Sequence, residues 1–318
     1  MGENQKTLNI KRPFPSLFSP NLLLPRYWGN WALIGLVGCC VFLPRSWVLI
    51  LGRGVGSLFF RVNKKRVRIA RINLRWCFPH LDHQARERIL KTHLTRYGQA
   101  IIDLGLIRWG SRKTIDRLCT IEVEAELKDR VQSGEKILLI IPHVVGIDMA
   151  GAALARVARG ASMMKEPSNP LLHWWLLRGR TRFGARIFMR SQGVRPLVKS
   201  IRSGYVGYLM PDEDLGGEHS VFAPFFGIET ATLPVVGRLA RMTDATVIPM
   251  FCILSEEGRY KVVLGDPIED FPTQNPELDA AKVNLAFQAY IQDAPEQYLW
   301  TLKWFRTRPN GESSPYDA

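Results

Sequence analysis

The sequence predicts an α/β fold with a central, mostly parallel sheet flanked by helices, and two observations carry this prediction. Short continuous apolar runs, typical of strands buried on both faces, lie at 136–141, 205–210, 245–252 and 260–264. Segments with helical spacing alternate with them, at 83–106, 123–133, 146–157, 170–182, 194–202, 230–243 and 279–292. Such alternation is typical of a helix-covered sheet.

The first of these elements illustrate the pattern. In 83–106, apolar residues such as Leu90, Leu94 and Ile101 recur on one side of a helix. Gly134 ends the helix expected over 123–133, and 136–141 follows as a strand of the buried type. Ligands in such folds gather where strands end, so the residues after each apolar run are the ones to examine.

Charge is distributed very unevenly along the chain. The whole protein has a net charge of +14, but residues 1–81 hold thirteen basic residues and a single acidic one, Glu3, which leaves +2 for the other 237 residues. The same N-terminal segment contains the longest apolar run, Trp31–Leu43. An apolar run flanked by cations indicates contact with an anionic membrane.

At about 1.5 Å per residue, the run from Trp31 to Leu43 covers only ~20 Å of a ~30 Å hydrocarbon core. Residues 28–51 together form either a proline-kinked span or a helix lying in the membrane interface. A signal peptide or a buried core helix are the other interpretations, although a small-residue cleavage site is missing. By the positive-inside rule, the body after Arg61 stays cytoplasmic.

Three regions are therefore expected: a membrane-anchoring segment with an N-terminal helix over 1–61, a cytoplasmic catalytic domain over 62–309, and a disordered polar tail over 310–318. The five cysteines are odd in number and contain no Cys-x-x-Cys pair. Neither a disulfide framework nor a zinc ribbon is indicated, in keeping with a reducing cytoplasm.

The clearest chemical signal follows the strand at 136–141, where His143 lies in a turn and Asp148 in the first turn of the next helix. A neutral imidazole can take a proton from a hydroxyl through one nitrogen when a carboxylate holds the other. The sequence therefore suggests His143 as general base and Asp148 as the carboxylate that orients it. The spacing by itself is common, and a lone histidine before a helix is more often structural.

The chain resembles the secondary acyltransferases of lipid A biosynthesis, within the wider glycerolipid-acyltransferase group that has a His-x4-Asp signature. The resemblance covers nearly the whole chain and rests on several blocks in order: 25–29, 73–79, 142–148, 182–184, 202–205, 211–216, 218–220, 295–298 and 307–308. The pairing of Ile147 with Asp148, with 204–208 and 232–238, is closest to the myristoyltransferase type, since the lauroyl type commonly has a glutamate at the dyad.

This resemblance implies an acyl-acyl carrier protein donor and, as acceptor, a hydroxyl on an acyl chain of a Kdo-bearing lipid A precursor. It implies no metal and no other cofactor, and a place at the inner membrane of a Gram-negative bacterium with the catalytic domain on the cytoplasmic side. Lys165 lies two residues before Pro167, where many family members have arginine. It is expected to contact the oxyanion or a phosphate, and a solvated lysine is the alternative.

Further substrate contacts are expected from two groups. Arg190 and Arg195 belong to a series of eight cations between 178 and 202 that suits lipid A phosphates or the acidic carrier protein, or else forms a solvated helix face. Asp212 and Asp214 follow the strand at 205–210 and are expected to bind sugar hydroxyls or brace their loop, with a metal site as the weaker alternative.

Two other functions stay open on the sequence. One acylates another membrane glycolipid or a lysophospholipid, and the other is a non-catalytic membrane adaptor that binds acyl carrier protein. Nucleic acid is not an expected partner, because the basic segment lacks interleaved aromatic residues and any known module. The acyl chain itself needs an apolar groove, for which 171–177 and 221–226 are candidates.

Overall fold

The structure, a computed structural model, describes residues 18–317. Its centre is a seven-stranded sheet in the order β1-β9-β8-β2-β5-β3-β4, in which every neighbouring pair is parallel except β8 with β9. The strands are β1 (Cys119–Ile121), β2 (Ile137–Ile140), β3 (Gly160–Met164), β4 (Arg186–Met189), β5 (Val206–Leu209), β8 (Thr246–Leu254) and β9 (Tyr260–Leu264). A separate antiparallel hairpin joins β6 (Val221–Phe225) to β7 (Ile228–Thr232).

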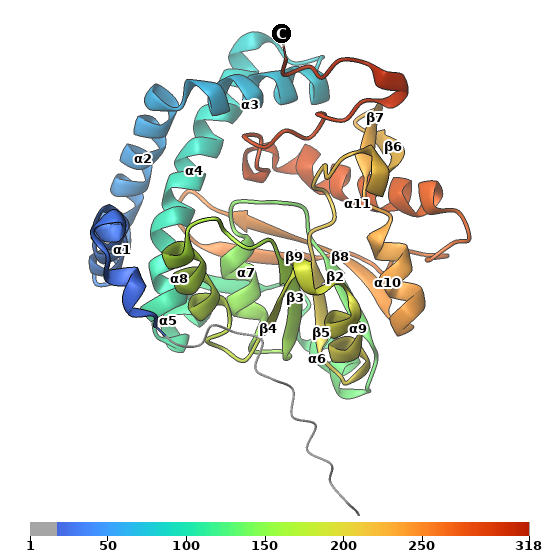
Figure 1. Cartoon of the computed structure of the whole chain (residues 1–318), viewed down its shortest axis with the longest axis horizontal. Helices are drawn as coiled ribbons and strands as arrows, with labels where there is room; N and C mark the ends of the chain where they lie inside the picture. The colour runs from blue at the N-terminus through green and yellow to red at the C-terminus, as the bar shows by residue number, and fades with distance from the viewer. Residues whose placement is uncertain (1–17, 318) are drawn as a thin grey trace, which may run out of the picture.

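Helices cover the sheet on both faces, as predicted (Figure 1). One layer contains α4 (His83–Trp109), α5 (Arg112–Leu118), α7 (Ile147–Leu154) and α8 (Pro170–Arg180), which contact one another. The other contains α9 (Arg195–Arg202), α10 (Val235–Thr243) and α11 (Pro276–Asp293). The remaining helices are α1 (Trp28–Cys40), α2 (Arg45–Val62), α3 (Lys64–Cys77) and α6 (Glu124–Gln132). The predicted mixed α/β fold with a mostly parallel sheet is confirmed.

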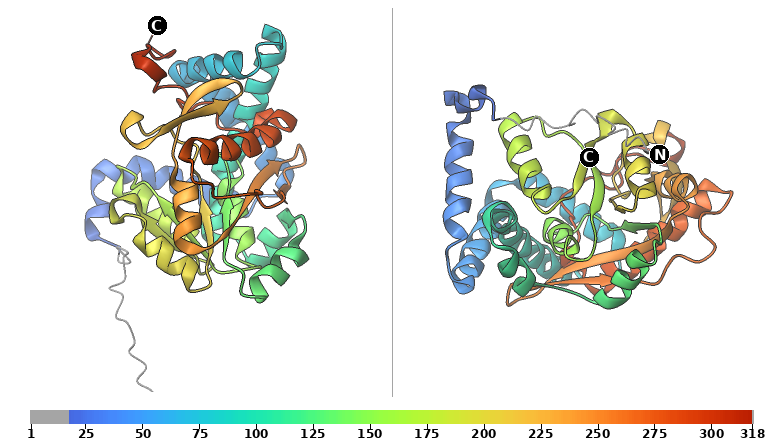
Figure 2. Two further views of the ribbon diagram at one scale, coloured as in Figure 1. Left: turned by 90° about the vertical axis from the view of Figure 1, so that its right-hand side faces the viewer. Right: turned by 90° about the horizontal axis from the view of Figure 1, so that it is seen from below.

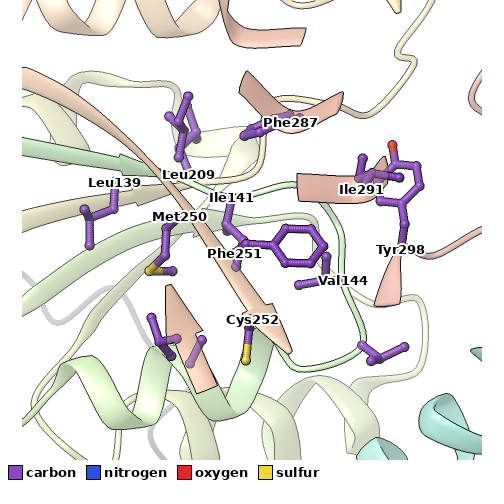
Figure 3. Packing of buried hydrophobic residues seen from close by; sticks show 14 of the residues in the cluster. Leu139, Ile141, Val144, Leu209, Met250, Phe251, Cys252, Phe287, Ile291 and Tyr298 are labelled. Carbon is purple, nitrogen blue, oxygen red and sulfur yellow. The ribbon is translucent and has the colours of Figure 1, made fainter. Parts of the chain in front are cut away.

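The main core lies where the central strands meet α11. All four residues of β2 are buried, because neighbouring strands flank β2 on both sides and helices cover both faces. Figure 3 shows Leu139 and Leu209 from neighbouring strands together with Phe251 of β8 and Phe287 of α11 in this packing. The continuous apolar runs at β2 and β8 therefore correspond to strands with almost no solvent-facing side, whereas β9 exposes Lys261.

Some predicted elements need correction. The helix expected over 230–243 begins only at Val235, because 228–232 forms the strand β7 and Pro234 precedes the helix. The strands β3 and β4 were not predicted. β3 is rich in small residues that are depleted in strands, and β4 has only four residues within the basic series.

The N-terminal segment forms two helices, α1 and α2, separated by a turn at Pro44. Figure 1 shows α2 running beside α4. The approach is close because glycines face each other: a Cβ at Gly56 would overlap the backbone of Leu94, and one at Gly98 the backbone of Gly52. In residues 18–317, no helix is both long and apolar enough to cross a membrane.

Both ends of the expected domain scheme differ from the structure in detail. The boundary at 61 falls inside α2, and residues 1–17 of that segment lie outside the described part of the chain. The tail expected to be disordered over 310–318 instead returns to the body up to residue 317. Tyr316 is buried. Its hydroxyl donates a hydrogen bond to Oδ1 of Asn73 in α3 and accepts one from the backbone N–H of Phe305. The buried ring of Tyr316 and the hydrogen bonds of its hydroxyl hold this short segment against the body.

Candidate active site

His143 lies in the turn that follows β2, at the carboxyl edge of the sheet. The C-terminal segment braces this turn: the N–H of Val145 donates to the carbonyl of Gln297, and the N–H of Leu299 to the carbonyl of His143, each at 2.9 Å. Val144 forms a β-bridge with Tyr298. The backbone of His143 is therefore held by residues more than 150 positions away in the chain.

The side chain of His143 pairs with Asp212. Its Nδ1 lies 2.6 Å from Asp212 Oδ1, and its own backbone N–H donates to Oδ2 at 2.8 Å. The hydroxyl of Tyr298 donates to the same Oδ2 at 3.1 Å. The strand register explains the meeting, because Ile140 of β2 pairs with Leu209 of β5 and each functional residue lies three positions further on.

The predicted contact between His143 and Asp148 is wrong. Asp148 forms a two-point ion pair with Arg180 of α8 instead, with Nε to Oδ1 at 2.6 Å and Nη2 to Oδ2 at 3.1 Å. The planar guanidinium matches both carboxylate oxygens, and Nδ1 of His143 already bonds Asp212. In this structure Asp212 is thus the residue that orients the histidine.

The surroundings of His143 favour its protonated form. Burial is the largest influence and acts to lower the pKa of His143, but the charge and hydrogen bond of Asp212 act together in the other direction. The net result is a pKa above the ordinary value of 6.5. A raised pKa suits a base that must take a proton near neutral pH, since basicity and availability of the neutral form are then balanced.

A cavity of about 400 Å³ opens in front of this pair. Polar residues His143, Asp148, Lys165, Arg180, Arg190 and Glu213 line it. Its apolar wall includes Leu104 and Ile107 of α4 and Met163 and Met164 of β3. In the described part of the chain no hydrogen bond engages Nε2 of His143, so this nitrogen is available to a bound hydroxyl.

The predicted substrate contacts fall into two groups. Lys165 and Arg190 line the cavity, and Arg190 pairs with Glu213 at 2.6 Å. Arg195 begins α9 and is exposed away from the cavity lining. Asp214 is buried and accepts from the N–H and hydroxyl of Thr307 at 2.6 and 2.7 Å, so it braces its loop.

Both carboxylate oxygens of Asp212 bond His143 and Tyr298, which favours the bracing alternative over the contact with sugar hydroxyls. Within residues 18–317, no three His, Cys, Asp or Glu side chains are grouped so as to hold a metal ion.

Three residues of the site were not singled out by the sequence. Arg180 was one of eight cations without a distinct signal, and Glu213 stood beside two aspartates. Tyr298 ended a block of the family resemblance, which was the one available hint. Its ring stacks on Trp304 with centroids 4.7 Å apart, and Trp304 in turn lies 5.8 Å from the His143 ring.

A half-buried histidine–aspartate pair at the carboxyl edge of an α/β sheet, with an imidazole nitrogen free beside a largely apolar cavity, is an arrangement that can activate a hydroxyl by base catalysis, which is the chemistry of a group-transfer enzyme. Comparison with known proteins identifies the family to which this enzyme belongs. Residues 16–307 match the family described as bacterial lipid A biosynthesis acyltransferase. The chain belongs to this family, whose members transfer an acyl group in lipid A biosynthesis.

Individual relatives extend over almost the full chain. A lipid A biosynthesis acyltransferase of Haemophilus influenzae is 32% identical over 98% of this chain and 99% of its own length. A lipid A biosynthesis myristoyltransferase of Escherichia coli K12 is 32% identical, covering 94% and 93%, respectively. A lauroyltransferase from the same organism is 30% identical, covering 94% and 98%.

Proposed function

We propose that this protein transfers a fatty acyl chain from acyl-acyl carrier protein to a hydroxyl on an acyl chain of a Kdo-bearing lipid A precursor. The observation that carries the proposal is the pairing of His143 with Asp212 beside a cavity, in a chain that belongs to the lipid A acyltransferase family. The Nε2 atom of His143 takes the proton of the acceptor hydroxyl, and Asp212 stabilises the imidazolium that forms.

The remaining steps follow from the thioester. The deprotonated oxygen forms a bond to the thioester carbonyl carbon, and the carbonyl oxygen gains negative charge. When the intermediate collapses, the C–S bond breaks and the imidazolium returns its proton to the leaving thiolate. Cations that line the cavity, Lys165 and Arg190 among them, are the groups we assign to the oxyanion or to lipid A phosphates.

Asp148 keeps a role in this proposal, but as a positioning residue. Its ion pair holds the guanidinium of Arg180 at the wall of the cavity. Burial acts to lower the pKa of Arg180, and the charge and hydrogen bond of Asp148 more than compensate. Arg180 therefore stays cationic and fixed in direction beside the reacting groups.

The donor chain we propose is myristoyl. Support comes from the sequence around Ile147 and Asp148, which resembles the myristoyltransferase type. The identities of 32% and 30% to the myristoyl- and lauroyltransferases are too similar to separate the two donors.

The proposed site of action is the cytoplasmic side of the inner membrane of a Gram-negative bacterium. Large apolar side chains are exposed on α1, on α2 and in the turn between them, among them Trp28, Leu36, Phe42, Trp47, Ile50 and Leu58. Exposed cations such as Arg53, Lys64 and Lys65 lie on the same helices or directly after them. An exposed apolar surface rimmed by cations fits an interface of anionic lipid.

Vesicle flotation tests this membrane contact. The wild-type protein should float with vesicles of phosphatidylglycerol and less with phosphatidylcholine, while Ile50→Glu should weaken both interactions. Leu285→Glu, an exposed leucine on α11, is the matched control and should float like wild type. Equal flotation of Ile50→Glu and Leu285→Glu would exclude α2 as the contact.

The reaction itself is tested with wild type and His143→Ala in membranes. Lauroyl- and myristoyl-acyl carrier protein are supplied with Kdo-bearing precursors, and the product mass is measured. Acyl addition by the wild type alone establishes the reaction, and the mass increase identifies the donor. No transfer by the wild type, or equal transfer by the variant, overturns the mechanism and favours a non-catalytic adaptor.

A further inference from the structure

A cluster of arginines lies where the C-terminal end of α4 meets α8. Arg108 is the second-last residue of α4, Arg178 lies in α8, and Arg182 comes just after that helix. Burial lowers the pKa of Arg108 from its ordinary value, and the charges of Arg178 and Arg182 lower it further. Within residues 18–317, no carboxylate acts on this pKa in the other direction.

The half-buried guanidinium of Arg108 has no anionic partner in the described part of the chain, and its Nε is buried without an acceptor. Arg182 differs, because it donates to the carbonyl of Gly110 at 2.6 Å and so caps the end of α4. Asp148 lines a small cavity together with Arg108, but Arg180 bonds both of its oxygens. A cation that is partly removed from water and lacks an acceptor is costly unless an anion from outside the chain pairs with it.

Two tryptophan rings hold this guanidinium. Its Cζ lies 5.4 Å from the ring centroid of Trp109 and 5.7 Å from that of Trp174. Contact with aromatic faces fixes the guanidinium and leaves the N–H donors at its edge for a ligand. These donors form a planar fork that matches two oxygens of a phosphate group.

The same two tryptophans place Arg108 beside α1. The ring of Trp174 lies 5.9 Å from that of Trp31, and a Cβ at Gly38 would lie 3.3 Å from the ring of Trp109. Figure 1 shows α1 next to α4 and α8, and the apolar faces of these helices pack together. The arginine cluster is therefore next to a helix that we assign to the membrane surface.

α1 supplies apolar surface but no charge. Its side chains Trp28, Leu33 and Leu36 are more than half exposed, and residues 27–44 contain no charged residue. A phospholipid whose chains lie against this helix brings its phosphate to the level of the interface, where cations stabilise it. Because α1 has none, the cation must come from a neighbouring helix, and Arg108 is in that position.

We propose that Arg108, assisted by the charges of Arg178 and Arg182, binds the phosphate of a membrane phospholipid whose chains lie against α1. The inference rests on the proposed membrane contact and adds a specific lipid site to it. This site is separate from Lys165 and Arg190, the cations that line the cavity of His143. A lipid bound there fixes how the molecule is turned on the membrane.

A short-chain lipid tests the site without a membrane. Dihexanoyl phosphatidylglycerol, kept below its micelle concentration, is titrated into the full-length protein by calorimetry, with dihexanoylglycerol as the phosphate-free probe. A hydrogen bond to a charged group changes affinity by about 10-fold or more, so Arg108→Gln should raise the Kd of the phosphate-bearing lipid at least about 10-fold. Arg108→Lys keeps the charge without the planar fork and should lie between.

The matched control is Arg238→Gln, which removes the same charge from an exposed position of α10 in the other helical layer. Its Kd should equal that of the wild type. The inference is overturned by an equal Kd in Arg108→Gln and Arg238→Gln, by equal binding of dihexanoylglycerol, or by no binding to the wild type. Thermal unfolding without lipid checks that each variant folds. If Arg108→Gln does not fold, a Kd of Arg108→Lys equal to that of the wild type overturns the inference.

Vesicles and turnover separate this site from the two proposals beside it. With phosphatidylglycerol vesicles, Arg108→Gln should float less than Arg238→Gln. If the wild type binds the short-chain lipid but floats with no vesicle, the lipid site is supported and the membrane contact fails. If Arg108→Gln leaves lipid binding unchanged and raises only KM for the acceptor, the phosphate is that of the acceptor, and the inference is overturned.

Discussion

Two carboxylates at the same edge of the sheet have different tasks. Asp212 follows β5, is 6% exposed, and receives the histidine ring, the histidine backbone and a tyrosine hydroxyl. Asp148 opens α7, is 19% exposed, and holds Arg180 at two points. The carboxylate nearer to His143 in the chain is thus not the one that binds it.

The difference shows that the partner of His143 is decided by which strands are neighbours in the sheet and not by which carboxylate is nearer in the sequence. Five residues separate His143 from Asp148, but the turn directs the imidazole toward the neighbouring strand β5. Figure 2 shows the molecule from two further directions, with helices on either side of the central sheet. In that sheet β2 and β5 are direct neighbours. Removing each charge in turn separates the roles of the two carboxylates.

The largest effect is expected for Asp212→Asn. The amide keeps the size of the side chain but no longer stabilises the imidazolium or the correct tautomer of His143. Loss of the equivalent charge in a serine-protease triad reduces turnover by about 10⁴-fold, so acyl transfer should fall by about 10³- to 10⁴-fold. Single-turnover transfer at saturating donor measures this effect, with donor binding measured separately as the control.

The pH dependence should change in the same variant. In the wild type the base is active when neutral, so kcat/KM rises with pH through the pKa of His143, which lies above 6.5. Asp212→Asn removes the two largest influences that raise this pKa, and burial, which lowers the pKa, is then the largest influence that remains. The acidic limb of the residual activity should therefore move to lower pH. An unmoved limb would mean that Asp212 does not act through His143.

A smaller loss is expected for Asp148→Asn. The histidine keeps its partner, but Arg180 loses its two-point contact and its fixed direction. Misplacement of such a group costs on the order of 10²-fold in rate. The acidic limb should stay where it is in the wild type. A limb that moves in Asp148→Asn and not in Asp212→Asn would restore Asp148 as the orienting residue.

The smallest effect is expected for Tyr298→Phe. This change removes one of the hydrogen bonds to Asp212 and keeps the stacking on Trp304. A single hydrogen bond contributes ~0.5–1.5 kcal/mol, which corresponds to a decrease of about 2- to 10-fold in kcat. KM for the donor should not change. A decrease as large as that of Asp212→Asn would indicate a direct part for the hydroxyl in the reaction.

Local patterns predicted much of this protein correctly. The continuous apolar runs correspond to β2, β5, β8 and β9, and helical spacing located α4, α6, α7, α8, α9 and α11 to within a few residues. The short strands β3 and β4 were missed because four or five residues without a strong apolar signal give no period to detect. Lys165 and Arg190, which were expected to contact substrate, line the cavity beside His143.

By itself, the sequence determined the layered α/β fold and the position of His143 at the end of a buried strand, because both depend on hydrophobic periodicity and on residues adjacent in the chain. The tertiary structure alone decided that Asp212 orients His143 and that Asp148 holds Arg180 at the wall of the cavity. The physical reason is that hydrogen bonding between parallel strands joins residues far apart in the chain, and no local pattern specifies which strands become neighbours.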